Sequence, residues 1–221
     1  MPEPTSASFR DLTVADFVDR LSSAEPVPGG GAASAIAASL GASLVAMVAG
    51  LSEGRPKYEQ HATLITRARE AGDRLKVRFL DLADEDAAAY GRLAAAFKMP
   101  RETDEQRTAR TAAIRSAARV AADVPFSCVD ACLELVATAE ALAGRSNVNA
   151  SSDVAVAALL GQAAARGAAE NVLINLPSVG DESYAGQMGS QVLGLLDDIE
   201  RLAAETREIV RRGTARDPLP G

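Results

Sequence analysis

Apolar residues recur at spacings of three and four along almost the entire chain, the pattern of α-helices that are buried on one face. The pattern predicts a short helix over 14–22, with Thr13 and Asp16 in a weak capping arrangement at its start. Longer helices are predicted over 32–51, 57–98, 103–143, 151–175 and 181–213. No internal repeat, linker or change of composition divides them. We therefore expect a single all-α domain over 1–221, a bundle of about six helices with its core over about 12–211.

Proline and glycine mark the expected ends of these helices. Counted from the short helix over 14–22, Pro100 ends the third helical pattern, Gly144 closes the fourth, and Pro177 is expected to stop the fifth. Pro125 falls inside the fourth helix, where a proline kinks or breaks the backbone, so we expect a kink near this position. The last residues, 214–221, are predicted to be frayed.

The predicted helix over 32–51 carries no charge. It is rich in Ala, Ser and Gly, which are less favourable in lipid than Leu or Ile, and no basic flank accompanies it, so we do not expect a membrane span. Small residues lie one turn apart at Ala38, Ala42 and Ala46. Such residues let helix backbones approach closely, so this helix is predicted to be central and buried.

Three glycines, Gly29, Gly30 and Gly31, lead into this helix. Neither a P-loop nor a dinucleotide fingerprint fits them, because no strand precedes them and no lysine follows. Two interpretations remain open. The glycines either make a tight turn, or they bring the free N–H groups of the helix N-terminus against a ligand.

An acidic residue interrupts the apolar stripe of the long helix over 57–98. The stripe includes Phe79 and Leu82, then reaches Asp86, and Tyr90 follows one turn later. A carboxylate on a buried face is costly unless it is hydrogen-bonded, paired or placed in a working cleft. Asp86 is therefore either a structural cap or ion-pair partner, or a general acid–base whose pKa burial raises. Tyr90 is a candidate for substrate binding beside it.

The predicted fifth helix is apolar in its middle and polar at both ends. Ser151 to Asp153 form its expected cap, and Asp153 either complements the helix dipole or serves as a second catalytic acid. Asn171 and Asn175 lie one turn apart near its other end. They either bind a flat, hydrogen-bonding ligand together or are ordinary polar residues.

Composition and charge narrow the classes of function. The net charge is −7 and no basic cluster stands out, so no nucleic-acid partner is expected. Cys128 and Cys132 are expected to be free thiols on one helix face. The single histidine, His61, is predicted to lie at the surface, and no metal site of the usual Cys/His kind is expected. The N-terminal stretch has no apolar segment typical of a signal peptide, so we expect a cytoplasmic protein.

The chain resembles the C-terminal family of the formiminotransferase-cyclodeaminases. Three segments carry the resemblance: PVPGGGAASAIAASLGASLVAMVAGLS, LADEDAAAYGRLAAAFKMP and NVNASSDVAVAALLGQAAARGAAENVLINL. It covers roughly 12–211. The resemblance implies an all-α fold, a homodimer or higher oligomer, a folate substrate and no metal or organic cofactor. By position, the resemblance implies that the site residues of the family are the three glycines, the acids Asp86 and Asp153, and the amides Asn171 and Asn175.

The family includes the cyclodeaminase half of a bifunctional folate enzyme and stand-alone bacterial methenyltetrahydrofolate cyclohydrolases. The resemblance therefore implies hydrolysis of 5,10-methenyltetrahydrofolate to 10-formyltetrahydrofolate, with Asp86 as the first candidate for acid–base catalysis and Asp153 as the second. The alternatives are a formiminotetrahydrofolate cyclodeaminase that releases ammonia, and a non-catalytic folate-binding helical oligomer. The absence of a fused transferase domain favours the cyclohydrolase. Lys98, Arg101 and Arg110 are available cations for the glutamate tail of a folate.

Overall fold

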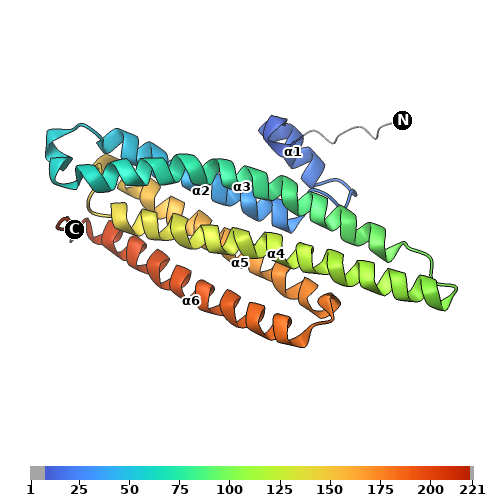
Figure 1. The fold of residues 1–221 in the computed structure, drawn as a ribbon. Coiled ribbons are helices and arrows are strands. Elements are labelled where there is room, and N and C mark those ends of the chain that lie inside the picture. Colours follow the sequence, from blue (N-terminus) through green and yellow to red (C-terminus); the bar gives the residue numbers. More distant parts are fainter. Residues whose placement is uncertain (1–7, 220–221) are drawn as a thin grey trace.

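The computed structural model describes residues 8–219 and shows a helical bundle (Figure 1). Its long helices are α2 (Gly30–Ser52), α3 (Ala62–Phe97), α4 (Asp104–Leu142), α5 (Ser151–Val179) and α6 (Glu182–Arg212), with a short α1 (Val14–Leu21) before them. Three 3₁₀ turns, Phe9–Asp11, Pro56–His61 and Val148–Ala150, complete the regular structure. Within the described range no strand is present, which confirms the predicted all-α class and the six helices. Residues 220–221 and residues 1–7, which begin the N-terminal stretch that lacks a predicted signal peptide, lie outside the described range.

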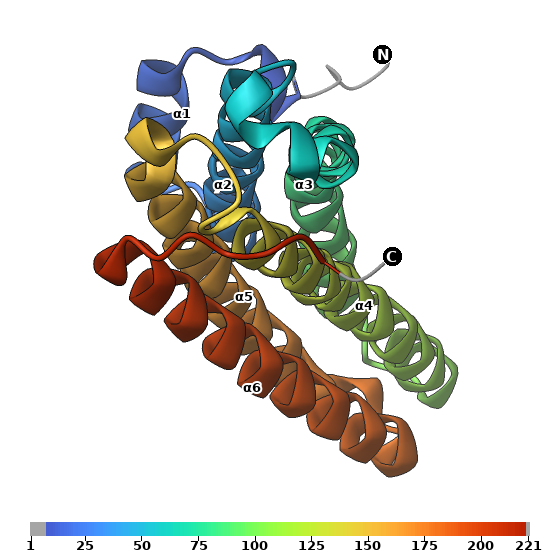
Figure 2. The ribbon, with the colours of Figure 1, turned by 90° about the vertical axis from the view of Figure 1, so that its left-hand side faces the viewer.

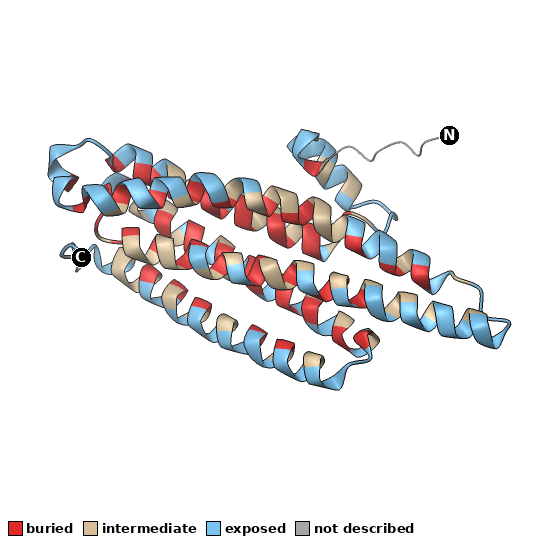
Figure 3. Cartoon of the chain, viewed as in Figure 1, coloured by how far each residue is buried: buried red, intermediate tan, exposed pale blue. Residues whose placement is uncertain are grey.

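The five long helices lie lengthwise beside one another, and α2 packs between α3 and α5 and also contacts α4 (Figures 1 and 2). Ala38 and Ala42 of α2 are fully buried, as the small-residue spacing predicts. Gly72 of α3 is part of the same close contact, because a Cβ atom there would lie 2.7 Å from the backbone nitrogen of Ala46. The red inner faces in Figure 3 show that the core runs along the bundle between these helices.

Among the described helices, α2 alone has the length and hydropathy that would suffice to cross a membrane. Half of this stretch is buried inside the bundle. Core helices of soluble proteins also meet the length and hydropathy test, and the contacts of α2 with three neighbouring helices are those of a core helix.

Several helix ends agree with the sequence prediction. The Thr13 side chain accepts a hydrogen bond from the Asp16 backbone N–H, and Asp181 does the same for Tyr184 at the start of α6. Gly144 follows α4 in the left-handed region, with a φ of 72°. Such positive φ angles favour glycine because it has no Cβ atom.

The structure confirms the predicted first residue of α5, but the predicted cap and the predicted end were wrong. The helix continues through Pro177 to Val179 and ends at Gly180, which has a φ of 67°. Proline removes one N–H donor, but in the last turn of a helix few further hydrogen bonds depend on it, so proline is tolerated there. At the other end no side chain caps the helix, so Ser151 and Asp153 belong to its first turn. In α4 the helix runs through Pro125 without a break.

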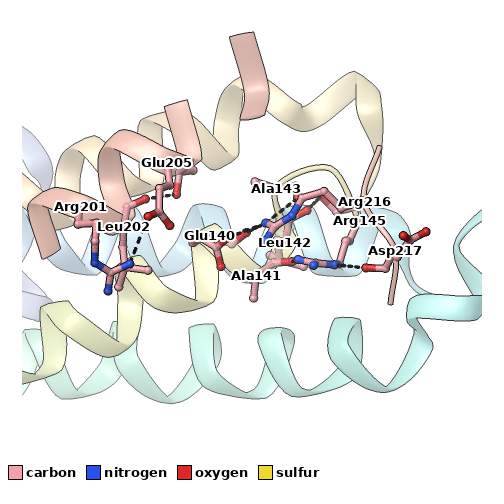
Figure 4. Close-up of polar contacts among 12 residues, drawn as sticks. Glu140, Ala141, Leu142, Ala143, Arg145, Arg201, Leu202, Glu205, Arg216 and Asp217 are labelled. Atoms are coloured by element: carbon pink, nitrogen blue, oxygen red, sulfur yellow. Dashed lines mark hydrogen bonds and ion pairs between the residues drawn. The ribbon is translucent and has the colours of Figure 1, made fainter. Parts of the chain in front are cut away.

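The segment after α6 is not frayed as predicted but is held against the end of α4 (Figure 4). The Arg216 backbone N–H donates to the Gly144 carbonyl at 3.0 Å, and the Arg216 guanidinium pairs with Glu140 at 2.6 Å. Arg145 Nε donates to the Asp217 carbonyl at 2.6 Å. Polar groups at the C-terminal end of α4 thus bind the segment after α6. Such contacts between distant parts of the chain are not revealed by helical periodicity.

His61 is buried, so its predicted place at the surface was also wrong. It ends the 3₁₀ turn before α3, near Arg145 and Asp217. Burial, together with the positive charge of Arg145, lowers the pKa of His61. Its hydrophilic sequence neighbours gave no sign that the C-terminal segment packs close by.

Candidate functional site

A pocket of about 220 Å³ opens where the N-terminus of α2 meets α3, α4 and α5. It contains the three glycines, Asp86, Tyr90 and both predicted asparagines. The full lining is Pro26, Val27, Gly29, Gly30, Gly31, Asp86, Ala89, Tyr90, Leu93, Ala121, Asn171 and Asn175. The structure therefore brings together residues from three separate parts of the chain that the sequence singled out one by one.

Asp86 is half-buried in α3 and faces the first turn of α2. Burial raises the pKa of the Asp86 carboxyl, and the backbone N–H of Ala32, which donates to it, acts in the opposite direction. The carboxylate thus combines the two roles left open by the sequence: it caps a helix N-terminus, and it lies in a pocket with its proton affinity increased. A raised pKa brings a carboxyl group closer to the range in which it can take up and return a proton near neutral pH.

Gly31 is the glycine that the carboxylate of Asp86 requires. A Cβ atom at this position would lie 2.3 Å from Asp86 Oδ1 and 2.4 Å from Oδ2. A Cβ at Gly29 would lie 3.6 Å from the Pro26 carbonyl oxygen, and a Cβ at Gly30 would lie 3.5 Å from Asn171 Nδ2, which are ordinary contacts. The glycine entrance is therefore a close approach between a helix N-terminus and an acid, rather than only a turn.

Asn171 and Asn175 place their amide groups on the α5 side of the pocket. Asn171 Nδ2 donates to the Gly167 carbonyl at 2.8 Å. Asn175 Nδ2 donates to the carbonyls of Asn171 at 2.7 Å and Ala121 at 3.0 Å. Because both amide nitrogens donate to backbone carbonyls, the side-chain oxygens of Asn171 and Asn175 remain available to accept hydrogen bonds from a ligand.

Tyr90 and the apolar lining complete the pocket. Tyr90 is exposed and forms part of the rim, one turn beyond Asp86. Ala89, Leu93 and Ala121 are buried in a small cluster of their own and supply an apolar wall. Their place in the site was not predicted, because apolar side chains at helical spacing are indistinguishable from ordinary core residues.

Asp153 lies elsewhere. It is in the first turn of α5, eighteen residues before Asn171 on the same helix, which corresponds to about 27 Å at 1.5 Å per residue. It does not line the pocket, and within one chain it cannot act on a ligand held by Asp86. Its position matches the alternative interpretation, an acid that complements the positive end of the helix dipole.

The predicted cations lie beyond the pocket lining, around the connection between α3 and α4. Lys98 follows α3 about 12 Å along the helix direction from Tyr90. Arg110 Nη2 donates to the Phe97 carbonyl at 3.2 Å, while its Nε is buried without a partner among the described residues. No group of three or more His, Cys, Asp and Glu side chains within 8–219 is arranged to hold a metal ion.

A second, slightly larger cavity of about 280 Å³ lies at the other end of the bundle, between the start of α5 and the end of α6. Its lining includes Lys57 and Tyr58 but no carboxylate. It therefore lacks an acid–base group of the kind that Asp86 provides, and the smaller pocket is the better candidate for catalysis.

Comparison with known proteins identifies the family of this chain. The formiminotransferase-cyclodeaminase family model matches residues 13–193, a span that contains every residue lining the Asp86 pocket. The chain belongs to this family. The resemblance noted from its sequence segments is thereby confirmed.

Two relatives represent the two activities found in the family. A methenyltetrahydrofolate cyclohydrolase of Methylorubrum extorquens is 35% identical over 90% of this chain and 96% of its own length. A formimidoyltransferase-cyclodeaminase of Rattus norvegicus is 30% identical over 89% of this chain, which spans only 36% of that longer protein. The crystal structure of a formiminotetrahydrofolate cyclodeaminase from Thermotoga maritima superposes with a TM-score of 0.83 at 26% identity, over 92% of this chain and 98% of that one.

Proposed function

We propose that the protein is a methenyltetrahydrofolate cyclohydrolase, which hydrolyses 5,10-methenyltetrahydrofolate to 10-formyltetrahydrofolate. The observation that carries the proposal is the pocket around Asp86, which offers a carboxyl group of raised pKa and the acceptor oxygens of two asparagines. The methenyl substrate is an amidinium cation, and a pocket rich in acceptors suits a positively charged ligand with N–H groups. The 35% identity to a cyclohydrolase of nearly the same length supports this choice of reaction.

The proposed reaction needs one acid–base group. Water adds to the bridging carbon of the amidinium, forming the new C–O bond, and Asp86 accepts a proton from that water. The bond from this carbon to N5 then breaks, and Asp86 returns the proton to N5. The formyl group remains on N10, and one proton is released to solvent for each substrate hydrolysed. In its ionised form Asp86 also stabilises the positive charge of the bound amidinium.

The rest of the pocket orients the substrate in this proposal. The Asn171 and Asn175 carbonyl oxygens accept hydrogen bonds from N–H groups of the pterin ring, and the glycine entrance allows the ring to approach the backbone. Lys98, Arg101 and Arg110 lie toward the α3–α4 connection, where a negatively charged glutamate tail leaving the pocket would be attracted. We further propose that the reaction uses no metal or organic cofactor and takes place in the cytoplasm.

The first alternative is the cyclodeaminase reaction, which the names of the longer relatives and of the structural neighbour favour. Here N10 attacks the formimino carbon of 5-formiminotetrahydrofolate, and ammonia leaves after protonation. The same carboxyl group could perform the proton transfer, so the Asp86 pocket suits both reactions.

One assay separates these possibilities. Purified protein is given 5,10-methenyltetrahydrofolate and 5-formiminotetrahydrofolate in separate experiments. A cyclohydrolase removes the near-ultraviolet absorbance of the first, whereas a cyclodeaminase creates that absorbance from the second. The Asp86→Asn variant should lose about 10²–10⁴-fold in turnover while still binding folate. Activity on neither substrate, with folate binding retained, would leave only the non-catalytic folate-binding oligomer.

We also propose that the protein is a homodimer. The outer face of α2 carries Leu40, Met47 and Leu51 at helical spacing, and each side chain is more than 40% exposed. An apolar stripe of this kind on a long helix is typical of a subunit interface. Light scattering after size exclusion should give twice the 22.8 kDa chain mass, and a Met47→Glu substitution should shift the protein toward the monomer.

A further inference from the structure

Pro125 leaves one backbone carbonyl of α4 without its usual partner. In an α-helix each carbonyl accepts from the N–H four residues later, and proline has no N–H. The carbonyl of Ala121 therefore has no such donor, although Ala121 lies well inside the helix. Asn175 of α5 fills the place, since its Nδ2 donates to the Ala121 oxygen at 3.0 Å. Pro125 is buried, and Ala121 lines the Asp86 pocket.

The contact with Ala121 fixes the orientation of the Asn175 side chain. The second amide hydrogen is donated to the Asn171 carbonyl at 2.7 Å, so two helices hold the two hydrogens of one amide group. The opposite flip would bring the Asn175 oxygen against two carbonyl oxygens, which is unfavourable. Oδ1 is consequently left without a partner among the described residues, and it is not among their buried unpartnered atoms. It is available to a ligand in the pocket.

We propose that Pro125 is a positioning residue for the substrate site: by withholding a backbone N–H, it lets Ala121 anchor Asn175 with its acceptor oxygen toward the substrate. This inference rests on the proposed function for its substrate, a folate whose ring carries N–H donors. If residue 125 had an N–H, that group would occupy the Ala121 carbonyl. Asn175 would then lose one of its two anchors and its terminal amide could rotate.

A double-mutant cycle between Pro125 and Asn175 tests the proposal through activity. Asn175→Ala should raise KM about tenfold in the parent, the effect of one well-placed hydrogen bond. Pro125→Ala alone should raise KM by a similar factor, with little change in kcat and no loss of thermal stability, because alanine is a better helix residue. In the Pro125→Ala background, Asn175→Ala should raise KM less than threefold. Equal effects of Asn175→Ala in both backgrounds would overturn the proposal.

A second measurement needs no substrate, so it stays decisive if the assays reveal a different reaction. The chain has four asparagines, Asn147, Asn149, Asn171 and Asn175, so selective ¹⁵N labelling of their side chains gives few signals to assign. In the parent, the Asn175 amide hydrogens should exchange slowly with solvent because both are bonded. In Pro125→Ala they should exchange at least tenfold faster, whereas the Asn147 signals stay unchanged. Unaltered exchange at Asn175 in a folded variant would contradict the proposed role of Pro125.

The matched control is Pro177→Ala, which also replaces a proline inside a helix but at an exposed position outside the pocket lining. It restores an N–H in α5 without supplying a donor to the Ala121 carbonyl. KM and the Asn175 exchange rate should both stay within twofold of the parent. If Pro177→Ala changed both as strongly as Pro125→Ala, the effect would be a general response to removing helix prolines, and the specific role would be refuted.

Discussion

Gly31 and Asp86 approach so closely that residue 31 has no room for a side chain: a Cβ atom there would lie 2.3 Å from Asp86 Oδ1. Gly31 is in the first turn of α2, and Asp86 is in the last third of α3. The same turn supplies the Ala32 N–H that donates to the carboxylate. The position of the candidate catalytic acid therefore depends on the residue type at the start of another helix.

Gly31→Ala should displace the Asp86 carboxylate without unfolding the protein. The added methyl group would contact the end of the Asp86 side chain, which can move. The substitution should therefore change the geometry of the site more than the stability of the fold. We expect turnover of the methenyl substrate to fall about 10²-fold, since a shift near 1 Å in a catalytic group has effects of this size. Steady-state kinetics together with a thermal melt would measure both properties.

Gly50→Ala is the control for this prediction, because Gly50 lies in the same helix and a Cβ there meets nothing within 4 Å. Its turnover should match the parent, and its stability should rise by about 0.5–1 kcal/mol. If Gly31→Ala retained parental turnover, Asp86 would tolerate displacement and its catalytic assignment would be weakened.

Asp86→Asn should change how stability depends on pH. Burial raises the pKa of Asp86 in the folded state above its ordinary value of about 3.9, so folding favours the protonated carboxyl. The contribution of Asp86 protonation to the free energy of unfolding is therefore fully present below the ordinary pKa. It is lost as the pH rises through the raised pKa of the folded state. Asparagine does not titrate. The free energy of unfolding of the parent minus that of the variant should thus decrease with increasing pH, as urea titrations of both ligand-free proteins can show; a difference that increases would contradict the raised pKa.

Gly72→Ala should destabilise the bundle, because the new Cβ would lie 2.7 Å from the Ala46 nitrogen and 2.8 Å from the Ala42 carbonyl oxygen. These are backbone atoms, so α2 and α3 would have to move apart. A loss of about 1–3 kcal/mol in the free energy of unfolding is expected from this overpacking. Gly91→Ala in the same helix has open space around its Cβ and should not destabilise the protein. Equal urea midpoints for the two variants would show that the helix contact is looser than described.

The parts of the fold that follow from local pattern were predictable from the sequence. Helical periodicity predicted six helices, and the small residues of α2 predicted its closely packed, buried face, because both properties depend on neighbours in sequence. The end of α5 was not predictable in the same way. Proline weakens a helix by only one hydrogen bond in the last turn, so Gly180, and not Pro177, ends it.

The candidate site was predictable residue by residue but not as an arrangement. Asp86 and the two asparagines were recognisable because polar groups on apolar stripes are unusual. Asp86 and Asn175 line the same pocket, whereas Asp153 does not. This depends on how four helices pack against one another, which the spacing of residues within one helix does not reveal. The apolar wall residues, such as Ala121, carried no chemical signal at all. Only the position of Pro125 one turn later hinted at an unusual carbonyl there.

The packing of the segment after α6 yields the last prediction, which contrasts two arginines shown in Figure 4. Arg216 donates to the backbone carbonyl of Glu140 at 2.9 Å and pairs with its carboxylate, and both side chains are at least three-quarters buried. Within residues 8–219, the ion pairs of Arg201 are all exposed and lie within its own helix. Arg216→Ala removes charge-assisted bonds at the end of α4 and should lower the free energy of unfolding by about 1–3 kcal/mol.

Arg201→Ala should leave the urea midpoint unchanged, because exposed ion pairs are screened by water and salt. Turnover should be unaffected in both variants, since the contact of Arg216 lies near Gly144, away from the Asp86 pocket. Comparing the urea midpoints of the two variants shows whether the segment after α6 is held by its contacts or is frayed. If Arg216→Ala were as stable as Arg201→Ala, the contacts after α6 would contribute nothing to stability, and the tail would behave as its sequence alone suggests.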